Sequence, residues 1–173
     1  MNGKAQIAVE YVLIIVFILS ILVAGMYIFR GYAMGSRDKI IENKVELISN
    51  AFIDNAREIY FLGEGSKKVV TIEMPDQVEN IIAFDAGGKE FYLIFNILTS
   101  SGQKELFYKS DVLIKKDSIT SIHYDDPASC HGADSCDFYY FRDNEISAGI
   151  KNFMIEAKKD DINYIDIEMV SLE

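Results

Sequence analysis

The chain has 173 residues, and 50% of them are hydrophobic. Its 27 acidic residues against 17 basic residues give a net charge of −10. This length suits one domain with a sizeable core. The acidity, without a basic patch, excludes a nucleic-acid partner and opposes binding to anionic membrane surfaces.

The N-terminal part contains an apolar run from Tyr11 to Phe29, in which Ser20 is the only clearly polar side chain. As a helix, this run extends about 28 Å, close to the ~30 Å hydrocarbon thickness of a bilayer. A secretory signal peptide has a shorter apolar core and then a small-residue cleavage site. Here Ala24 and Gly25 are followed by further apolar residues as far as Phe29. The segment is therefore predicted to be a retained membrane-spanning helix.

The charges flanking this run predict one orientation and the cysteines another. Lys4 is the only basic side chain before the run, whereas Arg30, Arg37 and Lys39 follow it. A positive-inside count places the larger domain in the cytoplasm. A disulfide bond would instead imply an extracytoplasmic domain, or the cytosol of a hyperthermophile.

An amphipathic helical section follows the apolar run. Gly31 and Gly35 weaken the helix between the two sections by about 1 kcal/mol each relative to alanine, so a bend or loosening is expected there. Beyond them, apolar residues recur at steps of three or four, and Gly63 and Gly65 end the helix. The apolar face consists of Ile41, Val45, Ile48, Phe52, Ala56 and Ile59.

The remainder is predicted to be rich in β-strands, because short apolar runs are separated by turn residues. The predicted strands cover residues 67–74, 78–85, 89–98, 103–109, 111–116 and 118–124. A final hairpin bends at 159–161. On its first strand, Phe153, Ile155 and Ala157 alternate with Met154, Glu156 and Lys158. On the other strand, Ile165, Ile167 and Met169 alternate with Tyr164, Asp166 and Glu168.

These elements predict an α+β fold. A long N-terminal helix, apolar in its first half and amphipathic in its second, packs on a C-terminal antiparallel β-sheet head domain. The strand at 91–98 is apolar on both faces. It is therefore predicted to lie centrally, with the helix on one side and other strands or a subunit on the other.

The two cysteines, Cys130 and Cys136, lie in a stretch rich in turn residues. A local disulfide is the favoured interpretation, since the interval closes easily. Free thiols, or a metal site completed by His123 and His131, are the alternatives. The spacing matches no usual zinc pattern.

Carboxylates surround the cysteine loop, and calcium binding or plain solvated charge would explain them. They do not follow the EF-hand order, which favours solvated charge. The residues concerned are Asp125, Asp126, Asp134 and Asp137. The sequence contains no GxSxG, HExxH or GxxxxGK[ST] motif, so neither an enzyme nor a cofactor is predicted.

The N-terminus resembles archaeal type IV pilin-like proteins that carry a class III, prepilin-type signal peptide. The resemblance rests on Lys4, Ala5 and Gln6, then Glu10 and Tyr11, leading into VLIIVFILSILV. It implies that a prepilin-type peptidase cuts between Ala5 and Gln6. Ala5 stands where glycine is more usual in the family.

The resemblance also implies how the chain is organised. Residues 1–5 are a cleaved leader, 6–30 a transmembrane and filament-core helix, 31–62 its amphipathic continuation, and 63–173 a β-rich extracellular head. In such assemblies Glu10 contacts the new α-amine of Gln6 on a neighbouring subunit, and Tyr11 belongs to the same assembly segment. The alternative is that Glu10 only lies in the first helical turn, where the helix dipole favours a negative charge.

The function implied is that of a pilin or minor pilin, self-assembling into a helical surface filament, with adhesion as its expected use. Its expected partners are the peptidase, the membrane and a pilus assembly platform. Its expected location is the cell membrane as precursor and then the cell surface. The alternatives are an archaellum component, a membrane-anchored binding or accessory protein that does not polymerise, and, least favoured, an anchored enzyme.

Overall fold

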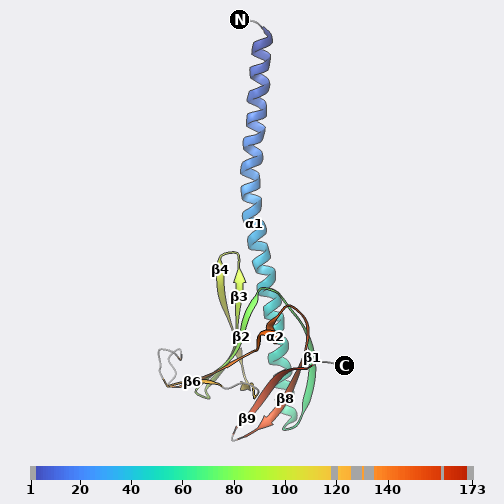
Figure 1. Ribbon diagram of the computed structural model, residues 1–173, viewed down its shortest axis with the longest axis vertical. Helices are drawn as coiled ribbons and strands as arrows, with labels where there is room; N and C mark the ends of the chain where they lie inside the picture. Colours follow the sequence, from blue (N-terminus) through green and yellow to red (C-terminus); the bar gives the residue numbers. More distant parts are fainter. Residues whose placement is uncertain (1–2, 118–120, 126–129, 131–134, 161, 171–173) are drawn as a thin grey trace. The chain divides into compact units, whose positions relative to one another are not determined.

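The computed structural model describes residues 3–117, 121–125, 130, 135–160 and 162–170, with side chains from Glu10 onward. The chain divides into two compact units, residues 1–40 and residues 41–173. Each unit is described by itself below. The predicted α+β class is confirmed, since one long helix is followed by antiparallel sheets with which its C-terminal part packs (Figure 1).

Helix α1 (Gly3–Leu62) is continuous through Gly31 and Gly35, so the expected loosening does not interrupt it. Its predicted end is confirmed. Gly63 adopts a φ of 94°, a left-handed conformation that most side chains disfavour, and its N–H donates to Ile59 O at 3.3 Å. The chain then leaves the helix and enters the first strand.

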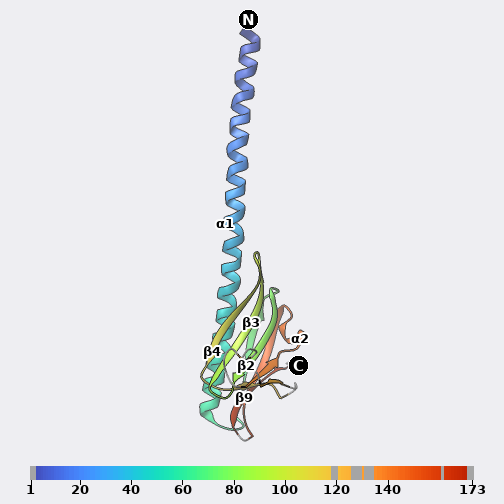
Figure 2. The ribbon, with the colours of Figure 1, turned by 90° about the vertical axis from the view of Figure 1, so that its left-hand side faces the viewer.

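The strands form two sheets, where the sequence predicted one. The first has the order β1-β8-β9-β5, with β1 (Lys67–Met74), β8 (Gly149–Lys159), β9 (Asn163–Val170) and β5 (Ile114–Lys115). The second has the order β4-β3-β2-β7-β6, with β4 (Gly102–Ser110), β3 (Glu90–Thr99), β2 (Val78–Ala86), β7 (Cys136–Tyr140) and β6 (Ile122–Tyr124). Figure 2 shows β4, β3 and β2 side by side.

Several predicted strands match closely and others do not. The strand at 67–74 and the C-terminal hairpin are confirmed, and β3 is an inner strand as expected. The strand predicted at 111–116 shrinks to β5, which pairs parallel with β9. The strand predicted at 118–124 is β6 alone, and residues 118–120 lie outside the described residues. Strand β7 and the short helix α2 (Asp143–Ile146) were not predicted.

The predicted apolar face of the amphipathic section is confirmed. All six of its members are buried, and they form one core with side chains from both sheets. Phe52, which is fully buried, meets Phe153 of β8 edge to face, with ring centroids 5.0 Å apart. Since the two sheets share this core, the helix is the element that joins them.

The alternation predicted for the last strand is only partly correct. Ile165 and Ile167 are buried, but so are Tyr164 and Asp166 on the opposite face. The reason is a polar cluster: Lys158 Nζ contacts Asp166 Oδ2 at 2.6 Å and Asp117 Oδ2 at 2.7 Å, and the Tyr164 hydroxyl donates to Asp117 Oδ2. Paired polar groups can be buried where single ones cannot.

A second, smaller core lies on the other face of the five-stranded sheet. Ile82, Phe84 and Ile94 are buried there with Cys130 and Cys136. Residues 81 and 83 of the same strand point into the main core, because successive side chains of a strand alternate. The five-stranded sheet therefore has apolar side chains on both faces.

Replacing Phe52 with alanine is expected to lower the free energy of unfolding by about 3 to 5 kcal/mol, the usual effect of deleting a buried ring. Leu47→Ala is the matched control on the same helix, since Leu47 is 70% exposed, and it should change stability by less than about 1 kcal/mol. Urea unfolding followed by near-ultraviolet circular dichroism measures both. Equal losses in the two variants would contradict the assigned core.

Candidate functional site

The residues singled out near the N-terminus lie within α1. The helical backbone begins at Gly3, so Lys4, Ala5 and Gln6 occupy its first turn. Glu10 is four residues beyond Gln6, about 6 Å further along the helix axis and on the same face. An α-amine created at Gln6 would therefore lie one turn from residue 10.

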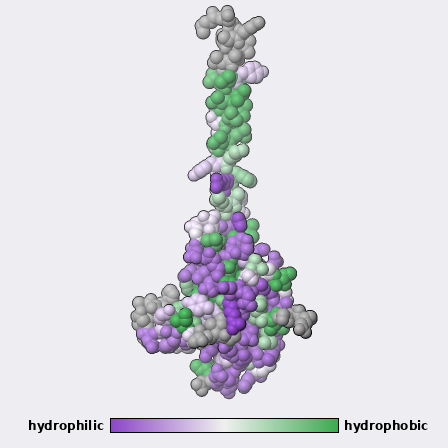
Figure 3. Space-filling model, in the orientation of Figure 1, coloured by the Kyte–Doolittle hydropathy of each residue, from purple (hydrophilic) through white to green (hydrophobic). Residues whose placement is uncertain are grey.

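The segment after Glu10 presents apolar side chains in every direction. Every large apolar side chain from Tyr11 to Phe29 is more than half exposed. By length and composition, α1 is the one helix in the described residues that could cross a membrane. Figure 3 shows hydrophobic side chains covering the visible side of this segment. In water such a surface is unfavourable, so the segment needs hydrocarbon or other apolar helices around it.

The one clearly polar side chain in this run, Ser20, is satisfied within the helix. Ser20 Oγ donates to the Val16 carbonyl at 2.8 Å. This back-bond removes the need for water or another partner. Ser20 therefore does not prevent the segment from lying in an apolar environment.

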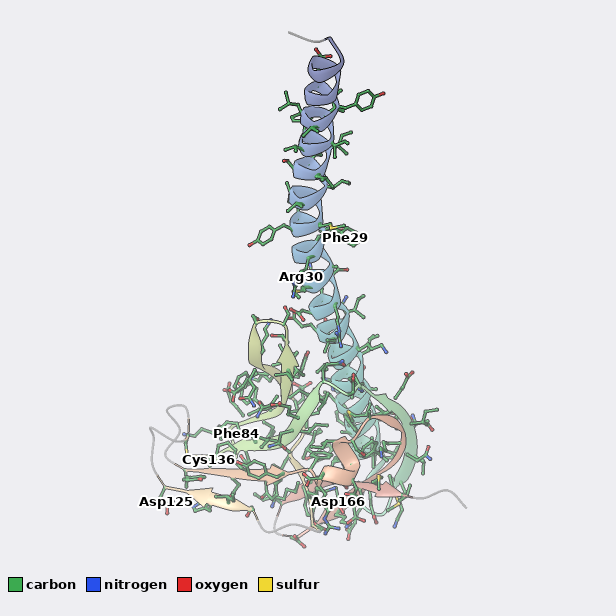
Figure 4. The ribbon with its side chains drawn as sticks, turned by 45° about the horizontal axis from the view of Figure 1, so that its top comes forward. Phe29, Arg30, Phe84, Asp125, Cys136 and Asp166 are labelled. Atoms are coloured by element: carbon green, nitrogen blue, oxygen red, sulfur yellow. A yellow bond between two sulfur atoms is a disulfide. The ribbon has the colours of Figure 1, made fainter. Side chains whose placement is uncertain are left out.

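A charged boundary ends the run. Phe29 and Arg30 are neighbours on the helix in Figure 4, and Arg37 and Lys39 follow. Basic side chains at the end of a membrane-spanning helix reach the interface while their stems remain in the apolar zone. Charged residues therefore flank the apolar run at both ends, Glu10 before it and Arg30 after it.

The predicted disulfide between Cys130 and Cys136 is confirmed. Their Cα atoms are 5.5 Å apart, and both residues are 1% exposed in the second core. Figure 4 shows Cys136 of β7 beside Phe84 of β2. Since the two sulfur atoms are bonded to each other, they are not free thiols and the metal site with His123 is not formed. His131, its other proposed ligand, lies outside the described residues.

His123 bridges two carboxylates next to this disulfide. Its Nδ1 lies 2.8 Å from Asp137 Oδ1, and its Nε2 lies 3.0 Å from Asp125 Oδ1. Hydrogen bonds to Asp137 and then to Asp125 raise the pKa of His123 above its usual value. Two of the four predicted loop carboxylates thus pair with an imidazole, while Asp126 and Asp134 lie outside the described residues.

Sequence reasoning missed a buried ion pair. Lys116 Nζ lies 2.5 Å from Glu145 Oε1 of α2, and both side chains are almost fully buried. Lys116 also donates to the Ile167 carbonyl and lies over the Phe141 ring. No local pattern marks such a pair, because its members are 29 residues apart. The pair connects the end of β5 to α2 and β9, and its role is structural.

No family model, no curated protein and no solved structure matches this chain. The case for its function therefore rests on the residues and geometry described above.

Removing the disulfide by the double substitution Cys130→Ala and Cys136→Ala is expected to lower stability by roughly 2 kcal/mol, as loop-closure entropy gives for so short a ring. The loss should be local, with faster hydrogen exchange in β6 and β7 and unchanged exchange in β8. Hydrogen-exchange mass spectrometry measures this difference. Uniformly faster exchange in both sheets would contradict the assignment of the disulfide to a separate core.

Stability is expected to fall as pH rises through the raised pKa of His123. The charged imidazole contributes fully below its unfolded pKa of about 6.5, and the contribution disappears above the higher folded pKa. Melting temperatures from pH 5.5 to 9 should show this decline in the wild type. It should be absent in His123→Gln, and identical pH profiles for the two proteins would contradict it.

Proposed function

We propose that this chain is a structural subunit, a pilin or minor pilin, of an archaeal type IV pilus-like surface filament. The observation that carries the proposal is the first section of α1. It is a continuous helix whose apolar side chains are exposed on all sides, with Glu10 directly before its apolar run. Such a helix is stable in a bilayer and also in a bundle of identical helices.

Glu10 favours the bundle over a simple anchor. An ionised carboxylate within hydrocarbon is costly, and such residues usually have a partner. The α-amine of Gln6, released by cleavage after Ala5, would supply a cation one helical turn away in the same chain and an equivalent cation on each neighbouring chain. A contact between chains would match the axial position of one helix to the next.

The head domain fits a location outside the cytoplasm. Its disulfide is typical of oxidising compartments. In the pilin-like family that the N-terminus resembles, the leader stays inside and the head outside, in spite of the basic residues after the span. The β-rich head would then be displayed on the filament, where adhesion is its expected use.

The second candidate is a membrane-anchored extracytoplasmic binding or accessory protein that does not polymerise. The same apolar helix supports it, since a single span of this length is sufficient as an anchor. This candidate gives Glu10 no partner on another chain and leaves it only the favourable end of the helix dipole, so that residue separates the two functions.

The test replaces Glu10 with alanine in cells that produce the protein. We expect the mature chain to begin at Gln6 in both proteins, and filaments to be lost in the variant. Mass spectrometry of the N-terminus and electron microscopy of sheared surface filaments measure these outcomes. Glu46→Ala, a change at an exposed position of the same helix, is the matched control and should retain filaments.

Three results would contradict the proposal or the role that it gives to Glu10. A wild-type chain that keeps Met1 in extracted membranes would remove the leader assignment. A wild type that is cleaved but never found in filaments would leave the anchored protein as the better reading. Normal filaments from Glu10→Ala would contradict the role given to the glutamate.

A further inference from the structure

Strand β4 forms one edge of the five-stranded sheet. It pairs with β3 from Gly102 to Ser110 and, among the described residues, with no other strand. Most of its side chains are exposed. A long edge strand presents a row of backbone N–H and C=O groups that another strand can pair with.

The hairpin geometry determines which residues of β4 face this open edge. β3 and β4 are joined by a two-residue turn, with Thr99 opposite Gly102. Residues flanking such a turn form a hydrogen-bonded pair, and bonded and non-bonded pairs alternate along the ladder. The residues whose backbone groups point away from β3 are therefore Gln103, Glu105, Phe107 and Lys109.

We propose that β4 is a homophilic contact, pairing antiparallel with β4 of a second copy of the chain, with Phe107 opposite Phe107 and Glu105 opposite Lys109. These three side chains share one face of the strand, since successive residues alternate. Leu106 and Tyr108 take the other face and pack on the main core. The two-fold symmetry of the contact forms the Glu105–Lys109 pair twice.

Charge complementarity selects this register among those that the backbone allows. Because only outward-facing residues can pair, the register shifts in steps that keep these residues opposite one another. A shift by two residues in one direction places Glu105 opposite Phe107 of the second copy. A shift by two more residues places it opposite Glu105 of the second copy. A step in the other direction places it opposite Asp111. Like charges directly opposite are destabilising, and only the proposed register forms both ion pairs.

The side chains of the proposed contact are exposed to solvent. Within the described part of the chain Glu105 forms no ion pair, and Phe107 is 47% exposed. Lys109 contacts Glu90 of its own chain at 2.7 Å but remains 58% exposed. An ammonium group has three donors, so it can serve both carboxylates. The contact uses only the second unit and does not rest on the function proposed for the N-terminal segment.

Zero-length crosslinking of the full chain in detergent micelles tests the contact directly. A carbodiimide joins a carboxylate and an amine that are already in contact. In an equal mixture of ¹⁴N- and ¹⁵N-labelled protein, we expect mixed-isotope peptides joined between Glu105 and Lys109. Within one strand these residues are about 13 Å apart, too far for such a link, so the product must join two chains. The Glu90–Lys109 link within a chain is the internal control for reactivity.

Charge reversal distinguishes this contact from association through the apolar helix. E105K alone and K109E alone each place like charges opposite each other, so we expect each to lose at least fivefold in dimer fraction by native mass spectrometry. Mixing the two variants places opposite charges together, so a heterodimer should form and show that both variants are folded. E73K, the same charge change on the exposed edge strand β1, is the matched control and should dimerise as the wild type does.

The expected recovery on mixing depends on antiparallel self-pairing in this register. A dimer fraction that is unchanged by either single reversal would overturn the proposal, because the helix alone would then hold the chains together. Loss without recovery on mixing, or a wild type without the Glu105–Lys109 crosslink, would also overturn it. None of these outcomes bears on cleavage before Gln6 or on the effect of Glu10→Ala.

Discussion

Burial of one helical stripe holds the head domain together. The two sheets are separate in their hydrogen bonding, and their common core is organised around the apolar side chains of α1 from Ile41 to Ile59. The Phe52 ring contacts the rings of Phe141, which directly follows β7, and of Phe153, which lies in β8. The two sections of the helix therefore need different surroundings. Its second section is satisfied by its own chain, whereas its first section exposes apolar surface that only a bilayer or other helices can cover.

The elements that could be predicted from the sequence are those with a strong local period. The apolar stripe of α1 and the hairpin of β8 and β9 repeat regularly over many residues, and both were found where expected. Strand β7 was missed because it follows the cysteine loop, where turn residues dominate, and is only five residues long. The division into two sheets could not be predicted, since strand order depends on distant pairings such as β1 with β8. The burial of Asp166 likewise depends on Lys158 and Asp117, which no local pattern connects.

Some features of the candidate site could likewise be predicted from the sequence, and others only the structure provides. The length of the apolar run and the position of Glu10 are properties of the sequence, and the helix only adds that residues 6 and 10 share a face. The disulfide was predictable from the short interval between Cys130 and Cys136. Its location in a second core, against Phe84 on the outer face of the sheet, was not. That location gives the loop a structural role, since the bridge covers apolar side chains that the main core cannot reach.

The two contacts inferred for this chain differ in symmetry, and this difference decides what each can build. A helix that packs beside an equivalent helix, with Glu10 of one chain meeting Gln6 of the next, uses two different surfaces and can continue without limit. An antiparallel pairing of β4 with β4 uses the same surface twice and closes after two chains. The charges on β4 have two opposite effects. Lys104 and Lys109 discourage pairing with an arbitrary strand at this edge. Glu105 makes pairing favourable in one register. A chain with both contacts can therefore extend an assembly through its helix and join two chains, or two assemblies, through its head.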